Sequence, residues 1–178
     1  MKKSKRVILF TSSLLFISVL IAYETLTKEQ IEKRNEENII AYYNEKEIEK
    51  ETYLGILSIP SIKLKRGFYD ELSSLNQVNK NILVVYDKMP NILVLAAHRG
   101  NSSVSFFNNL DQMKMGDSLF LDYQHDKREY LYLDRYMVEK NGNVPLSYDK
   151  SKKTLVLITC SKKDKQKQII YLAYEKRE

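Results

Sequence analysis

One cysteine and two histidines are the residues of this sequence best suited to nucleophilic chemistry. Cys160 is the only cysteine of the 178 residues, and the histidines are His98 and His125. A cysteine becomes an effective nucleophile as its thiolate, beside a group that transfers protons, which is usually a histidine. Cys160 and His98 each end a strongly apolar run, whereas His125 lies in the polar stretch QHDK. The pattern favours Cys160 as a nucleophile and His98 as its general acid and base, with His125 exposed and inert.

Both residues also have plainer interpretations, which the sequence leaves open. A single cysteine is often a small buried apolar residue, and a single histidine is often a hydrogen-bonded or surface residue. One cysteine can form neither an internal disulfide nor a cysteine-based metal cluster. The chain also contains no H-x-x-x-H, C-x-x-C, P-loop or G-x-G-x-x-G pattern. We therefore expect no cofactor and no metal in the candidate site.

Short apolar runs that alternate with turns predict the scaffold that positions these residues. Runs rich in β-branched and aromatic residues, separated by Gly, Pro and polar clusters, indicate β-strands. We predict strands in residues 55–60, 61–70, 81–87, 91–98, 118–123, 128–139, 154–159 and 168–174, and a short helix in residues 104–117 that ends at Gly116. Many short strands with little helix indicate a mainly β fold, a closed or nearly closed barrel. Strand ends then place His98 and Cys160 at the barrel rim.

The residues ahead of the predicted barrel divide into three segments of different composition. Residues 1–6 carry four positive charges, residues 7–23 contain no charged residue, and residues 24–52 are rich in charged helix formers without Gly or Pro. Seventeen uncharged residues are about enough to cross a bilayer, and the more positive flank stays in the cytoplasm. We predict a cytoplasmic basic tail, a single transmembrane anchor in the cell membrane, a charged helical linker and, in residues 53–178, an extracellular catalytic domain.

Two of these segments have alternative interpretations. Residues 7–23 could also be a cleaved signal peptide, but the small residues typical of a cleavage site are missing from the IAYETLT stretch that ends the run. Residues 24–52 could also be a flexible spacer, because their apolar stripe is thin. We favour the uncleaved anchor followed by a helical stalk that partly docks on the domain.

The charge of the chain gives little support to a nucleic-acid partner. The net charge is +6, and residues 54–178 carry twenty basic and fourteen acidic residues. A nucleic-acid-binding protein would place its basic residues on a recognisable binding module, and the sequence contains no such motif. We therefore expect no nucleic acid among the partners.

Four stretches of the sequence, in order along the chain, resemble motifs of the sortase family. LVLITC resembles the cysteine-strand signature TLxTC, and AHRGNSSVSFFNNLDQMKMGD resembles the histidine loop, in which GHR(G) is followed by F-x-x-L and G-D. GILSIPSIKL resembles the opening strand G-x-L-x-I-P-x-I-x-L, and VPLSYD resembles the V-x-P-x-x segment ahead of the cysteine strand. The resemblance covers about residues 53–175.

The resemblance implies both a fold and a reaction. Sortases are membrane-anchored cysteine transpeptidases of Gram-positive surfaces with an eight-stranded β-barrel. By position, the resemblance implies that Cys160 is the nucleophile and His98 the general acid and base. The expected partners are surface proteins with a C-terminal LPxTG-like sorting signal, cleaved at the Thr–Gly bond through a thioacyl enzyme. An amine of a cell-wall precursor or a pilin lysine would then resolve this intermediate.

The sequence departs from the family pattern where an arginine helps to stabilise the oxyanion. Gln168 stands at that position in the strand after Cys160, or Lys167 if the alignment shifts by one residue, and no arginine occurs in this stretch. A glutamine donates a hydrogen bond without charge, and a lysine lacks the bidentate fork of arginine. Ala97 and Val156 also replace the usual Gly and Thr. These departures leave open a catalytically degenerate sortase-fold binding or assembly module and, as a third interpretation, an unrelated membrane-tethered β domain.

Overall fold

The computed structural model of the chain describes residues 2–44, 52–89 and 91–176, with the side chains of residues 17–44, 52–85 and 91–176. Its backbone contacts divide the chain into two compact units, Met1–Glu36 and Glu37–Glu178. The second unit contains all the candidate site residues and begins ahead of the boundary expected at residue 53.

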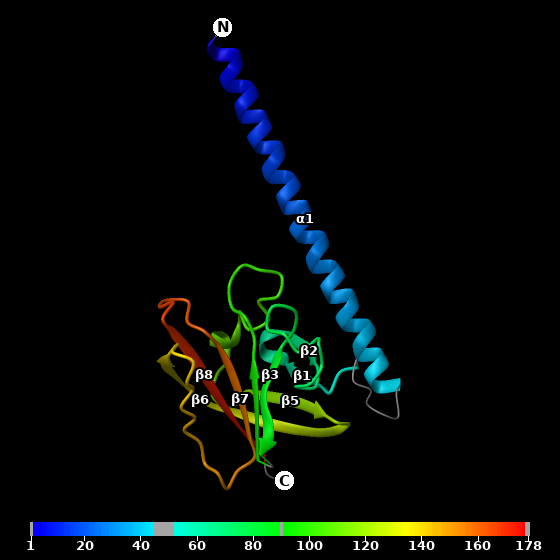
Figure 1. Cartoon of the computed structure of the whole chain (residues 1–178), viewed down its shortest axis with the longest axis vertical. Helices are drawn as coiled ribbons and strands as arrows, with labels where there is room; N and C mark the ends of the chain where they lie inside the picture. Colours follow the sequence, from blue (N-terminus) through cyan, green and yellow to red (C-terminus); the bar gives the residue numbers. More distant parts are fainter. Residues whose placement is uncertain (1, 45–51, 90, 177–178) are drawn as a thin grey trace. The chain divides into compact units, whose positions relative to one another are not determined.

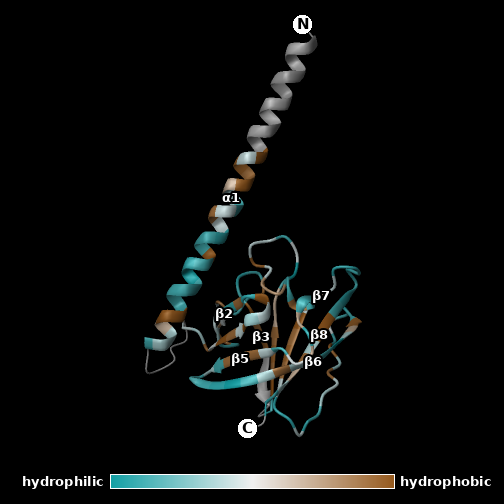
Figure 2. Cartoon of the chain, turned by 180° about the vertical axis from the view of Figure 1, so that it is seen from behind, coloured by the Kyte–Doolittle hydropathy of each residue, from teal (hydrophilic) through white to brown (hydrophobic). Residues whose placement is uncertain are grey.

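Helix α1 spans Lys2–Asn44 (Figure 1). The predicted linker is therefore helical as far as Asn44, and its residues 45–51 lie outside the described residues. Figure 2 shows hydrophilic residues predominating in the later turns of α1, as expected from the charged composition. Across the residues with described side chains, no helix has the length and apolar character needed to cross a bilayer. Residues 7–16 of the predicted anchor lie outside those residues.

Eight strands of the second unit form one sheet with the order β2-β1-β5-β6-β8-β7-β4-β3 (Figure 1). The strands are β1 Gly55–Ile59, β2 Leu64–Phe68, β3 Leu83–Met89, β4 Ile92–Ala96, β5 Ser118–Tyr123, β6 Asp126–Glu139, β7 Thr154–Cys160 and β8 Lys167–Glu175. Neighbouring strands are antiparallel, with the exception of β4 and β7, which run parallel.

The sheet curls into a nearly closed barrel. Its edge strands are β2 and β3, and a single parallel bridge joins Phe68 of β2 to Ile82, the residue before β3. Both side chains belong to the apolar core inside the barrel. An eight-stranded barrel is narrow enough for side chains to fill its interior. The predicted mainly β, eight-stranded fold is confirmed, and of the closed and nearly closed barrels that the sequence left open, the structure has the nearly closed one.

Strand β7 is apolar on both faces, which sets the surroundings of the candidate site. Leu155 and Leu157 point into the barrel core, whereas Val156 and Ile158 join a second apolar cluster on the outer face. This alternation follows from the two-residue period of a strand. A strand buried on both faces reads as a continuous apolar run, and TLVLIT is such a run.

Residues 104–117 do not form the predicted short helix. They form turns, with one 3-10 helix, η2, at Leu110–Gln112, and a second 3-10 helix, η1, lies at Pro60–Ile62. The Asn108 side chain donates to the Gly100 carbonyl and accepts from the Gly100 N–H, both at 2.7 Å. Asparagine side chains that bond to the backbone in this way favour turns over helices.

Residues 37–44 of α1 pack in the same unit as the barrel, through Tyr42. The buried Tyr42 hydroxyl donates to Asp122 Oδ1 at 2.8 Å and accepts the backbone N–H of His125 at 2.7 Å. The His125 ring, in the turn between β5 and β6, is exposed and stacks on the Tyr42 ring. Burial raises the pKa of Tyr42 above its ordinary value, so the hydroxyl keeps the proton that it donates to Asp122.

We expect Tyr42→Phe to lower the free energy of unfolding by about 1–3 kcal/mol, because it leaves the buried Asp122 carboxylate without its donor. Among the described residues, Asp122 Oδ2 already has no hydrogen-bond partner. Urea denaturation of the full chain measures the effect. Tyr148→Phe is the matched control, since the Tyr148 hydroxyl bonds to none of the described residues. Equal stabilities of the two variants would show that the Tyr42 bonds contribute nothing.

Candidate active site

Cys160 is the last residue of β7 and ends a row of paired residues across three strands. It pairs with Gln168 of β8, and Gln168 pairs with Val138 of β6. Because side chains alternate along a strand, Cys160 lies on the outer face, in line with Val156 and Ile158. The cysteine is free and partly exposed, as a nucleophile must be.

His98 follows β4, the strand that lies parallel to β7. The Ala97 N–H donates to the Ile158 carbonyl at 3.2 Å, and the Thr159 hydroxyl donates to the Ala97 carbonyl at 2.9 Å. The paired register ends at Ala96 opposite Ile158, and two residues further along each chain segment stand His98 and Cys160, on neighbouring strands that lie about 4.8 Å apart. Strand pairing therefore puts the two predicted residues at the same end of the sheet.

The two smaller departures from the family pattern fit this strand end without strain. Ala97 is buried, and its φ is not positive, so the position does not require glycine. Val156 is completely buried in the outer apolar cluster, where a β-branched apolar side chain packs well.

The loop that carries His98 is held by hydrogen bonds at His98 itself and at Gly100. The His98 carbonyl accepts the N–H of Phe107 at 3.1 Å, and the side chain of Asn108 holds the backbone of Gly100. Gly100 has a φ of 148°, which a residue with a side chain rarely adopts. These contacts fix the loop in the absence of the predicted helix.

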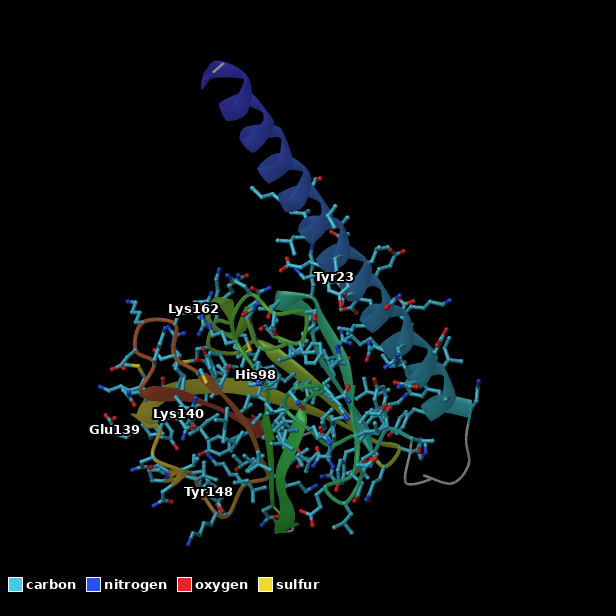
Figure 3. All side chains as sticks on the ribbon, turned by 45° about the horizontal axis from the view of Figure 1, so that its top comes forward. Tyr23, His98, Glu139, Lys140, Tyr148 and Lys162 are labelled. Atoms are coloured by element: carbon cyan, nitrogen blue, oxygen red, sulfur yellow. The ribbon has the colours of Figure 1, made fainter. Side chains whose placement is uncertain are left out.

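The connection between β6 and β7, residues 140–153, covers the outer face beside the site. The Tyr136 hydroxyl donates to the Pro145 carbonyl at 3.1 Å and accepts the N–H of Ser147 at 3.0 Å. Three half-buried residues of this connection pack on the outer apolar cluster: Val144, Leu146 and Tyr148. In Figure 3, His98, Lys140 and Tyr148 are labelled around the orange and red strands β7 and β8.

A cation that the sequence analysis did not single out lies against the thiol. The Lys140 Nζ donates to the Cys160 Sγ at 3.5 Å. Lys140 follows the last residue of β6, and its N–H donates to the Gln166 carbonyl at 2.7 Å, which extends the β6–β8 ladder by one step. No local motif marks Lys140, because it lies twenty residues from Cys160 and on a different strand. Only the strand order reveals the contact.

The structure also distinguishes the two alignments at the position of the family's arginine. Gln168 lies directly opposite Cys160 and therefore on the same face. Lys167 faces the other side, where its Nζ lies 3.8 Å from Glu139 Oε1 and 3.9 Å from Asp164 Oδ2. Of the two residues, Gln168 is thus the one whose side chain lies on the face of Cys160.

A cavity of about 430 Å³ borders the residue that follows Cys160. Its lining residues are Arg99, Asp111, Arg135, Tyr136, Met137, Ser161, Lys162, Lys163 and Ile169. Arg99 forms an ion pair of 2.6 Å with Asp111, and only 3% of its side chain is exposed. Lys162 Nζ lies 3.9 Å from the same carboxylate. The charge of Arg99, next to His98 in the sequence, is therefore balanced by Asp111.

A thiol, an imidazole and an ammonium group thus lie at one end of neighbouring strands. A thiol can attack a carbonyl carbon, an imidazole can transfer protons, and a cation can stabilise the charge on sulfur or oxygen. Together these groups suit acyl transfer through a thioester.

Comparison with known protein families agrees with this chemistry. The family model described as "Sortase domain" matches residues 57–176. No curated protein sequence matches the chain.

Several solved structures share the fold. Sortase C of Streptococcus pneumoniae has 22% sequence identity and a TM-score of 0.62, over 74% of this chain and 69% of that chain. A lid mutant of sortase A from Corynebacterium diphtheriae has 20% identity and a TM-score of 0.63, over 76% and 75%. Sortase C1 of Streptococcus agalactiae has 22% identity and a TM-score of 0.63, over 74% and 72%.

Proposed function

Because this chain belongs to the sortase family, whose members are cysteine transpeptidases, we propose that it joins proteins with an LPxTG-like sorting signal to an amine acceptor. The observation that carries the proposal is the placement of Cys160 and His98 at adjacent ends of the parallel strands β4 and β7. Family membership supports the reaction class, and the strand register supports the assignment of roles.

In the proposed first step, the Cys160 thiolate attacks the carbonyl carbon of the Thr–Gly bond. A carbon–sulfur bond forms, and the carbonyl oxygen becomes an oxyanion. The carbon–nitrogen bond then breaks, and protonated His98 gives its proton to the leaving amine. The products are a thioester on Cys160 and a neutral imidazole.

In the proposed second step, the acceptor amine attacks the thioester carbon. Neutral His98 takes a proton from the amine, a carbon–nitrogen bond forms, and the Cys160 thiolate leaves. The thiolate and the protonated imidazole are restored, so the cycle consumes one amide bond and forms another. The acceptor is an amine of a cell-wall precursor or a pilin lysine.

The proposed place of this reaction is the outer surface of a Gram-positive cell. The uncharged residues 7–23, preceded by the basic residues 1–6, support a single-pass anchor with its N-terminus in the cytoplasm. The helical linker would then hold the barrel outside the membrane, where sorting signals and wall precursors are found.

A second candidate function is a sortase-fold module that binds or assembles without catalysis. Gln168, in place of the arginine, is the observation that favours it. Loss of one oxyanion donor costs roughly 2.7–4 kcal/mol of transition-state stabilisation in a protease, which slows turnover without necessarily abolishing it.

A transpeptidation assay on the full-length chain separates the two functions. We expect the wild-type protein to convert LPxTG-like peptides, in the presence of triglycine or a lysine-containing peptide, into products that mass spectrometry identifies. A catalytically degenerate module would form no product from any of the LPxTG-like peptides tested. In that case the Gln168→Arg variant should show activity that the wild-type protein lacks. An active wild-type protein, with product formation that depends on the amine, excludes the degenerate module.

A further inference from the structure

We propose that Lys140 is a catalytic residue of this site and supplies the positive charge that Gln168 lacks. The inference deepens the proposed transpeptidase function and rests on it for the oxyanion step. It starts from the 3.5 Å contact between the Lys140 Nζ and the Cys160 Sγ.

The fold directs Lys140 toward the thiol. Val138, Gln168 and Cys160 form a row across β6, β8 and β7, and Lys140 lies two residues beyond Val138, on the same face. The hydrogen bond from the Lys140 N–H to the Gln166 carbonyl holds the backbone in this register. To reach sulfur on β7, the lysine side chain crosses the end of β8, the strand in which sortases carry their arginine.

Lys140 also differs from two nearby cations, Lys167 and Arg99, in its lack of an acidic partner. Among the described residues, no carboxylate oxygen lies within 4 Å of its ammonium group. Lys167, by contrast, lies near two carboxylates, and Arg99 is paired with Asp111. The charge of Lys140 is therefore available to the reacting groups.

This charge serves two stages of the reaction. In the resting protein, the ammonium group already lies 3.5 Å from the sulfur that attacks the carbonyl carbon, so the cation is in place as the attack begins. After attack, the oxyanion is attached to the carbon that is bonded to the same sulfur, so a small rotation of the flexible lysine side chain reaches it. Stabilisation of an oxyanion is worth most when the donor is already in place. Lysine acts here as a point charge, without the bidentate fork of arginine.

The first test measures local charge at Cys160 without any substrate. Because the chain has one cysteine, alkylation reports on this site alone. We divide the alkylation rate with anionic iodoacetate by the rate with neutral iodoacetamide. Both rates depend equally on the fraction of thiolate, so this ratio reports only the attraction of the anionic reagent to a nearby cation. We expect Lys140→Met to lower this ratio about fivefold, as expected for one unit charge near 4 Å in water.

Lys150→Met is the matched control for this measurement. It removes the same charge from the same β6–β7 connection, but Lys150 is held near Asn91, at the opposite end of β4 from His98. Its alkylation ratio should stay within about twofold of the wild-type value, because exposed charges beyond the Debye length are screened. Equal ratios for Lys140→Met and Lys150→Met would overturn the inference.

The second test measures transpeptidation by the same variants. We expect Lys140→Met to lower kcat about a hundredfold and Lys140→Arg to retain most of the activity. Adding Gln168→Arg to Lys140→Met should restore turnover, because it returns a cation to the position opposite Cys160. Equal turnover of Lys140→Met and Lys150→Met would overturn the catalytic role. A lowered alkylation ratio in Lys140→Met, combined with a wild-type protein that shows no turnover, would overturn the proposed function while supporting the placement of the Lys140 charge at the sulfur.

Discussion

Cys160→Ala is expected to abolish transpeptidation, lowering turnover by at least about a thousandfold, because no other group of the site can form the thioester. Peptide cleavage should be measured by release of the C-terminal fragment, and the thioacyl adduct by intact mass with the acceptor omitted. The wild-type protein should gain the mass of the acyl fragment, and the variant should gain none.

Two further measurements keep this result interpretable. Cys160 is partly exposed at a strand end, so its replacement by alanine should change the free energy of unfolding by less than about 1 kcal/mol. Cys160→Ser keeps a hydroxyl group in place of the thiol and should be nearly as inactive, because a hydroxyl is a far weaker nucleophile. An alanine variant that retains a tenth of wild-type turnover would exclude Cys160 as the nucleophile.

His98→Gln is expected to lower turnover by about 10²–10⁴-fold, the usual contribution of a general acid and base. Glutamine preserves side-chain polarity but cannot carry the proton between the leaving and the attacking amine. The assay is steady-state transpeptidation with saturating acceptor, and added imidazole should restore part of the lost rate.

His125→Gln is the control for this variant, because His125 is the other histidine of the chain and lies in the exposed turn between β5 and β6. The turnover rate of His125→Gln should equal that of the wild-type protein. A loss of less than about threefold in His98→Gln, with His125→Gln equally affected, would mean that neither imidazole transfers the proton. The roles of His98 and Cys160 rest on these two experiments.

The strands of the barrel could be read from the sequence because their signals are local. Runs such as SLFLDY and TLVLIT become β5 and β7, and the first two residues of the polar stretch QHDK form the turn between β5 and β6. The predicted helix of residues 104–117 was wrong because the conformation of this segment depends on hydrogen bonds from a side chain to a backbone eight residues away. Asn108 bonds to the backbone of Gly100, and this competition is not visible in a helical pattern of apolar residues.

The sequence by itself determined the mainly β class, the order of the strands along the chain, and the choice of Cys160 and His98 as candidates, because apolar runs and the residues that end them are local features. Only the tertiary structure decided that Gln168, and not Lys167, lies opposite Cys160, and that Lys140 contacts the sulfur. Both facts depend on which strands are neighbours and in which register they pair. In the order β6–β8–β7, residues twenty positions apart become neighbours, and no local spacing in the sequence carries that information.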